Sequence, residues 1–233
     1  ASVNGTLDNT GDLLSQGAMA FYAQTVNNGG QMVSVGDVTL DGAQLTNRGS
    51  IQGDSLNLHQ NSIRNLGTLT GVSGLTLAAR KQLMARMAMA APQQQLINDA
   101  TGTLQTGGTL ELRSGEVTNN GSWQGKNILL DAQSLTNRGT IQSADALTLA
   151  LRDTLKSTQG SKVTAIGSAV LDAQILANQG QWAAKNLMLT ADRVENNGSM
   201  LGDDGLTVSA GQLIQQQNGK VLSGADMVLD VSG

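Results

Sequence analysis

The hydrophobic residues of this 233-residue chain follow a pattern that recurs about every twenty residues. Within each repeat, apolar and polar residues alternate over short runs bounded by Gly, Asn, Asp and Ser, which predicts short, half-buried β-strands. Each repeat opens with an apolar residue that lies 18 to 21 residues after the previous one, except for one interval of 33. These eleven anchor residues are Leu7, Val26, Leu45, Ile63, Leu96, Val117, Leu135, Leu155, Leu176, Val194 and Leu213.

Two polar positions recur at a fixed distance from the anchor. Asparagine stands two residues after it in nine repeats, with Ser157 and Gln215 in the other two: Asn9, Asn28, Asn47, Asn65, Asn98, Asn119, Asn137, Asn178 and Asn196. Glycine stands four residues after it in eight repeats: Gly11, Gly30, Gly49, Gly67, Gly121, Gly139, Gly180 and Gly198. The remaining three repeats have a longer turn, with the glycine at Gly102, Gly160 or Gly219.

A second apolar series follows this turn without a gap through all eleven repeats. It keeps its register because the longer turns delay the glycine and the next apolar residue by the same amount. The series consists of Leu13, Met32, Ile51, Leu69, Leu104, Trp123, Ile141, Val163, Trp182, Met200 and Val221.

A unit of this length cannot bury one apolar side alone, but it can when it is stacked on its neighbours. The sequence therefore predicts an all-β, parallel β-helix, or β-solenoid, of about eleven coils over residues 1–233. At about 4.8 Å per coil, the rod would be roughly 50 Å long. We expect the recurring Asn and Gly residues to be structural: stacked amides bond to one another, and both residue types tolerate a left-handed backbone at tight corners.

Three coils form a larger repeating block. The long turns follow Leu96, Leu155 and Leu213, and Trp123 corresponds to Trp182. Both tryptophans stand at an apolar position of the pattern, so we expect them in the core. Two exposed indoles that stack on sugar rings are the alternative.

The segment "ARKQLMARMAMAAPQQQ" interrupts the pattern, and residues 80–95 are predicted to emerge from the rod as a short helix or a loop. A helix with basic and methionine side chains is an alternative, as an element that binds a partner or a membrane surface, since methionine adapts to irregular apolar surfaces. The candidate partner-binding residues are Arg80, Lys81, Met84, Arg86 and Met87.

Composition excludes several classes of function. A net charge of −4 and a pI near 4.8 argue against a nucleic-acid partner, which requires clustered Lys and Arg. The chain has no cysteine, so disulfides and thiolate chemistry are absent. It has neither an 18-residue apolar run nor a signal-peptide pattern, so we expect it to begin within a longer protein.

Candidate chemistry is sparse. His59 is the only histidine, and we expect it at the surface rather than in a metal site or a catalytic triad. The pair Asp203 and Asp204 occurs once, which favours a polar turn over a calcium site. We therefore expect no catalytic residue, no metal site and no cofactor, and we predict that the chain is not an enzyme. A β-helix that cleaves polysaccharides is the less favoured alternative.

The stretches "LTNRGSIQGDSLNL" (45–58), "LTNRGTIQSADALTL" (135–149) and "VENNGSMLGDDGLTV" (194–208) resemble the filamentous haemagglutinin repeats of very large bacterial exoproteins secreted by the two-partner route. Such proteins include adhesins and the effectors of contact-dependent growth inhibition. The resemblance covers nearly the whole chain except about 80–95. It implies a right-handed β-helix from the shaft of such a protein, exported by an outer-membrane transporter partner.

The resemblance also implies a place and a role. The protein would be secreted or associated with the outer surface of a Gram-negative bacterium, and this segment would be a monomeric shaft that presents distal binding or toxin domains. The alternative is a module that binds a receptor or a glycan through the insertion or through one face of the rod.

Overall fold

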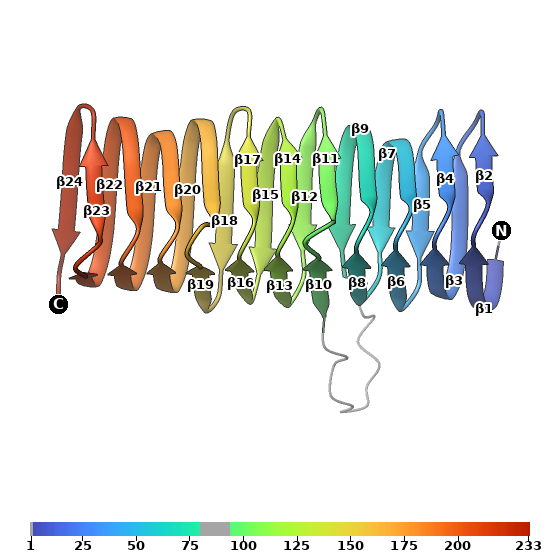
Figure 1. Ribbon diagram of the computed structural model, residues 1–233, viewed down its shortest axis with the longest axis horizontal. Helices are drawn as coiled ribbons and strands as arrows, with labels where there is room; N and C mark the ends of the chain where they lie inside the picture. Colours follow the sequence, from blue (N-terminus) through green and yellow to red (C-terminus); the bar gives the residue numbers. More distant parts are fainter. Residues whose placement is uncertain (1, 80–93) are drawn as a thin grey trace.

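The computed structural model describes residues 2–79 and 94–233, which form strands and turns without a helix. All 24 strands belong to one sheet, and every strand pairing is parallel. The coils stack into a straight rod with the two termini at opposite ends (Figure 1). The prediction of an all-β parallel β-solenoid of about eleven coils is confirmed.

Short strands dominate the first two thirds of the rod. They are β1 (Ser2–Asn9), β2 (Asp12–Ser15), β3 (Met19–Asn28), β4 (Gln31–Ser34), β5 (Val38–Asp41), β6 (Gln44–Asn47), β7 (Ser50–His59), β8 (Ser62–Asn65), β9 (Thr68–Ala78), β10 (Gln95–Asn98), β11 (Thr103–Thr106), β12 (Thr109–Arg113), β13 (Glu116–Asn119), β14 (Ser122–Gly125), β15 (Asn127–Ala132), β16 (Ser134–Asn137), β17 (Thr140–Ser143), β18 (Leu147–Leu151) and β19 (Thr154–Ser157). Most coils here are divided into separate strands by turns.

Long strands dominate the last third, where almost a whole coil is one strand. They are β20 (Lys162–Asn178), β21 (Gln181–Asn196) and β22 (Ser199–Gln215), followed by β23 (Lys220–Ser223) and β24 (Asp226–Val231). Register shifts between Ala165 and Ser168 and between Ala184 and Asn186 mark bulges in the pairing of these strands. A bulge bends a strand, so pairing continues around the corner.

The two apolar series of the sequence are the columns of the core. Each anchor residue pairs with the anchor of the next coil, from Leu7 with Val26 to Val194 with Leu213. The second series pairs in the same way, from Leu13 with Met32 to Met200 with Val221. Their side chains are almost fully buried except at the ends of the rod. Like residues therefore stack on like, which makes the core a set of columns.

The recurring glycines have a different physical cause from the one expected. The prediction of a left-handed backbone at these corners was wrong, because Gly160 alone has a positive φ (83°) among the described residues. Instead, the backbones of successive turns lie very close together: a Cβ on Gly49 would collide with the carbonyl oxygen of Gly30, and one on Gly67 with that of Gly49. Glycine is needed here because a side chain has no room.

The rod continues across the predicted insertion. The Ala79 backbone N–H donates to the Arg113 carbonyl at 2.9 Å, and the Gln95 N–H donates to the Asn61 carbonyl at 2.9 Å. Gln95, which the sequence assigned to the insertion, is the first residue of β10; its side chain is exposed, so its polarity did not reveal the strand. The predicted helix or loop itself lies outside the described residues. In the described part of the chain, no helix has the length and apolarity needed to cross a membrane.

Candidate functional site

The asparagine side chains form a column inside the rod. From coil to coil, each Nδ2 donates to the Oδ1 of the next asparagine: Asn9 to Asn28 (2.8 Å), Asn28 to Asn47 (2.8 Å), Asn47 to Asn65 (2.9 Å), Asn65 to Asn98 (2.9 Å), Asn98 to Asn119 (3.0 Å) and Asn119 to Asn137 (3.0 Å). None of these side chains is more than 8% exposed. A buried amide is costly unless it is hydrogen-bonded, so the column must remain in register.

Most of these asparagines also form a hydrogen bond within the turn that they begin. The Asn28 Nδ2 lies 3.0 Å from the Gly30 carbonyl oxygen in its own turn and 3.1 Å from the Ser50 carbonyl oxygen of the next coil. Asn65 repeats this arrangement with Gly67 at 2.9 Å. One amide therefore joins two coils and closes a corner.

The column is interrupted once, at Ser157. Its hydroxyl does not continue the amide bonds and instead accepts a hydrogen bond from the Trp182 Nε1 at 3.1 Å. Beyond it the column resumes, with the Asn178 Nδ2 donating to the Asn196 Oδ1 at 2.9 Å and the Asn196 Nδ2 to the Gln215 Oε1 at 3.1 Å. The asparagines thus form a long run before Ser157 and a short run after it.

Both tryptophans lie in the core, at 0% (Trp123) and 2% (Trp182) exposure. Neither indole can stack on a sugar from solvent, so that alternative is wrong. Trp123 lies one coil after Asn98, in the same position relative to it as Trp182 has relative to Ser157. However, Asn98 already bonds within the column, and the Trp123 Nε1 has no hydrogen-bond partner in the described part of the chain.

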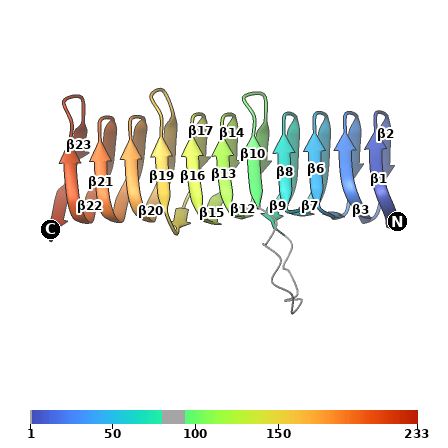
Figure 2. The ribbon, with the colours of Figure 1, turned by 90° about the horizontal axis from the view of Figure 1, so that it is seen from below.

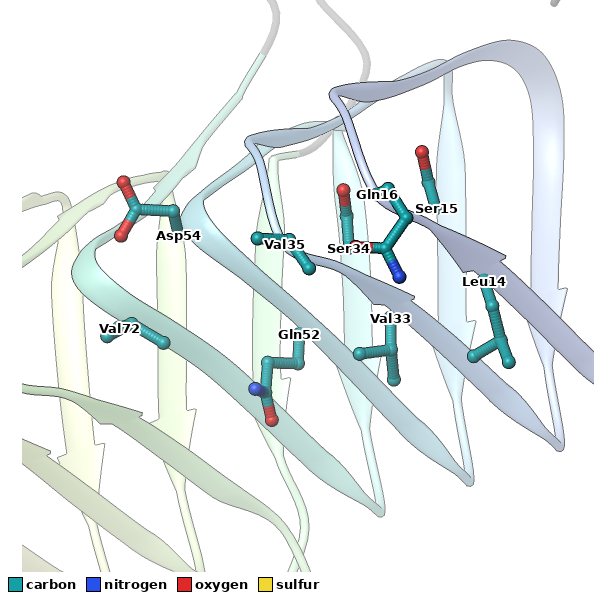
Figure 3. A pocket seen from close by; sticks show the side chains of 9 residues that line it. All are labelled: Leu14, Ser15, Gln16, Val33, Ser34, Val35, Gln52, Asp54 and Val72. Carbon is teal, nitrogen blue, oxygen red and sulfur yellow. The ribbon is translucent and has the colours of Figure 1, made fainter.

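An apolar groove runs over the first coils, on the outer side of β2, β4 and β7 (Figure 3). Leu14, Val33 and Gln52 point outward in register, one from each strand, and Val35 and Val72 lie along the neighbouring corner. Leu14 and Val35 are about two-thirds exposed, at 70% and 67%. The groove holds about 430 Å³.

The same outer row becomes polar further along the rod. Gln105, Gln124 and Gln142 occupy it in successive coils, beside an open hollow of about 720 Å³ that Lys126 and Ile166 also line. This face of the rod is therefore not uniform in polarity along its length.

A second hollow lies over the ends of β5, β7, β9 and β12. Its volume is about 650 Å³. It is lined by acidic, basic and uncharged residues: Asp41, His59, Thr76, Ala78, Ala79, Glu111 and Arg113. His59 is half-buried at its edge, paired in register with Asp41 of the preceding coil. The candidate partner-binding residues Arg80, Lys81, Met84, Arg86 and Met87 lie outside the described residues.

Several charged groups form exposed ion pairs between neighbouring coils. The Arg64 Nε donates to the Asp99 Oδ2 at 2.7 Å, and this hydrogen bond and the charge of Asp99 raise the pKa of Arg64. Arg152 pairs with Asp131 at 2.7 Å, and Lys185 with Asp204 at 3.5 Å. Exposed pairs of this kind contribute little to stability, because water and salt screen the charges. Within residues 2–79 and 94–233, three or more His, Cys, Asp or Glu side chains do not gather around any point that could hold a metal ion.

Comparison with known proteins finds matches over nearly the whole length of the chain. The haemagglutinin repeat matches residues 1–21, 22–83, 72–191 and 182–233. The chain is 46% identical over 89% of its length to a protein named tRNA nuclease CdiA from Escherichia coli, and 46% identical over 97% to one named 16S rRNA endonuclease CdiA from Enterobacter cloacae. It is 33% identical over 88% to one named deoxyribonuclease CdiA from Dickeya dadantii.

These relatives are far longer than the chain. The match spans 6% of the Escherichia coli protein, 7% of the Enterobacter protein and 6% of the Dickeya protein. No solved structure matches the chain.

Proposed function

The chain belongs to the haemagglutinin-repeat family, and from this premise we propose that it is a segment of the shaft of a very large exoprotein, an adhesin or an effector of contact-dependent growth inhibition. The shaft holds binding or toxin domains away from the surface of a Gram-negative cell. The observation that carries this proposal is the unbroken parallel register of all eleven anchor residues. A rod built in this way keeps one cross-section along its length and can be extended coil by coil.

The names of the relatives support a role that does not depend on catalysis. They name nucleases that act on three different targets, tRNA, 16S rRNA and DNA, yet all of them match this segment. A segment common to proteins with different named activities fits a mechanical role shared by all of them. We therefore propose that residues 1–233 form one rod within a longer protein and are not enzymatic.

The physics of stacked coils suits this role. The stability of a solenoid is approximately a sum of terms for each coil and each interface between coils, so length can change without a new core. In this chain, each interface contains the apolar columns, and every interface except the two beside Ser157 also contains the amide column. Coils can add one at a time at a growing end, which suits export of an unfolded chain through an outer-membrane transporter partner.

Export and oligomeric state form part of the same proposal. The protein is secreted or remains at the outer surface, and the rod acts as a monomer. Protease protection of stalled, half-exported chains tests the export step, since growth of the rod during export predicts protection of the coils that have already emerged.

The shaft function is tested by shortening the rod in the full-length protein. Deleting residues 155–212 removes three coils and places Leu213 where Leu155 stood, so the register is kept and the rod loses about 14 Å. We expect normal surface display and retained activity on target cells. Deleting residues 165–194 instead removes one and a half coils, breaks the register and should abolish display. Loss of target-cell activity with normal display after the first deletion would contradict a purely mechanical role.

A further inference from the structure

Five asparagines are followed directly by glycine: Asn4, Asn28, Asn120, Asn197 and Asn218. In such a pair, the glycine backbone nitrogen can lose its proton and attack the asparagine Cγ. A C–N bond forms, ammonia leaves, and water then opens the resulting succinimide to aspartate or isoaspartate. Glycine favours the reaction because no side chain hinders its nitrogen. The reaction also requires a mobile side chain and an unconstrained backbone, which a fold can withhold.

Hydrogen bonds hold both residues of the pair Asn28–Gly29 in place. Asn28 is 1% exposed; its Oδ1 accepts from the Asn9 Nδ2, and its Nδ2 donates to the Asn47 Oδ1 at 2.8 Å. The attacking nitrogen is also occupied, because the Gly29 N–H donates to the Asn9 carbonyl at 2.7 Å. The reaction cannot begin until this part of the stack opens.

The pairs at Asn4 and Asn218 have more freedom. Asn4 is exposed and lies in an irregular part of β1, where neither Asn4 nor Gly5 has a partner residue in β3. Asn218 is exposed in one of the long turns that project beyond the other turns of the rod (Figure 2). Its Gly219 N–H donates to the Gln216 carbonyl at 2.9 Å, a bond within the same turn that can open without disturbing another coil.

The remaining two Asn–Gly pairs are less constrained than Asn28 and more constrained than Asn4 and Asn218. The Asn120 Oδ1 accepts from the Arg138 Nη1 at 3.4 Å, and the Asn197 Oδ1 accepts from the Asn218 backbone N–H at 3.2 Å. Both side chains are partly exposed and are held by a single bond from the next coil. We therefore expect Asn120 and Asn197 to react at rates between that of Asn28 and those of Asn4 and Asn218.

We propose that Asn4 and Asn218 are sites of spontaneous deamidation in the folded rod, and that stacking of the coils protects Asn28. Protection at Asn28 is consequential because the Asn28 Nδ2 faces three acceptors, the Gly30, Ser50 and Asn47 oxygens. A carboxylate there would place oxygen against oxygen inside the column. Modification of this residue before folding would therefore interrupt the stack, whereas modification of Asn4 or Asn218 would leave it intact.

The test is incubation of the folded 233-residue chain at mildly alkaline pH, where loss of the proton from the glycine nitrogen is favoured. Peptide mass spectrometry measures the acid form at each of the five sites over time, and the urea-denatured chain serves as the reference. Each conversion adds one negative charge to the net charge of −4, so isoelectric focusing gives an independent readout.

We expect Asn4 and Asn218 to react first in the folded chain and all five sites to react in urea. Asn28 should be at least about a hundredfold slower when folded than in urea, since opening a buried column requires a large part of the stability of the structure. A Gly5→Ala variant provides the control: a methyl group at Gly5 meets no atom, so folding is kept while the reaction at Asn4 slows. Comparable rates at Asn28 and Asn218 in the folded chain would overturn the proposal, as would no reaction at Asn4 and Asn218.

Discussion

The coils before Ser157 and the coils after it are held together in different ways. Before it, coils are divided into short strands and are linked by the long run of asparagines from Asn9 to Asn137. After it, only Asn178, Asn196 and Gln215 continue the column, but β20, β21 and β22 pair over almost a whole coil. The first long strand, β20, begins in the same repeat as the interruption, five residues after Ser157. Continuous backbone pairing and side-chain stacking are therefore alternative means of keeping coils in register.

Trp182 lies where these two regions meet, and its loss should have the largest effect. Trp182→Ala removes a buried indole and its bond to Ser157, and truncation of a core tryptophan typically costs about 3–5 kcal/mol. Urea denaturation of the purified chain measures the loss. Trp182→Leu is the matched control, because leucine fills this column at Leu69 and Leu104, and it should cost less. An equal loss in both variants would show that the indole does not fill the interior as described.

Two column residues separate the contribution of the amide column from that of the tryptophan. Asn119→Ser breaks the long run and leaves buried amide groups unpaired, which should cost about 2–3 kcal/mol. Asn98→Ser breaks the same run and also removes the Asn98 bond to the Gly102 carbonyl, which keeps its bond from the Ser122 N–H. The serine places a hydroxyl where Trp123 can donate to it, as Trp182 donates to Ser157.

The Asn98→Ser variant should therefore be more stable than the Asn119→Ser variant by about 1 kcal/mol, the typical value of one hydrogen bond. Free energies of unfolding from urea titrations give the difference. If Asn98→Ser is the less stable of the two, the indole does not use the hydroxyl, and the interruption at Ser157 has another cause.

The ion pair between Arg64 and Asp99 should contribute least. Both side chains reach solvent, which screens the charges, so Asp99→Asn should reduce stability less than any of the core substitutions above. Pairing raises the pKa of Arg64, so this contribution is complete at neutral pH and is lost only as the pH rises through the raised value, in strongly alkaline solution. Unfolding measured from neutral to mildly alkaline pH should show the same small difference throughout. A loss that grows within this range would contradict the assignment.

Much of this architecture could be predicted from the sequence because stacking makes equivalent residues adjacent. Once Leu45 and Leu135 are recognised as the same position in different coils, pairing of every anchor follows. The reason for the glycines could not be predicted in this way. A left-handed corner and a close approach of two backbones both require glycine, and only the position of the Gly30 carbonyl against Gly49 distinguishes them.

Two other features depend on three-dimensional contacts. The sequence marks Ser157 as an exception, but the indole that uses its hydroxyl comes from the next coil, 25 residues later. The continuity of β20 depends on a bulge between Ala165 and Ser168. Gly167 lies there, but a glycine is as typical of a turn that ends a strand as of a bulge that continues it. The outward Leu14 and Val35 also fit a strand pattern equally well whether or not a neighbour covers them.

We expect the chain to behave as a modular rod whose coils can be removed in register. Small-angle X-ray scattering of the 233-residue chain and of the variant lacking residues 155–212 tests it most directly. We expect the maximum dimension to fall by about 14 Å, three coils at about 4.8 Å each, while the radius of gyration of the cross-section stays the same. An unchanged length with a thinner cross-section, or a swollen cross-section, would contradict it.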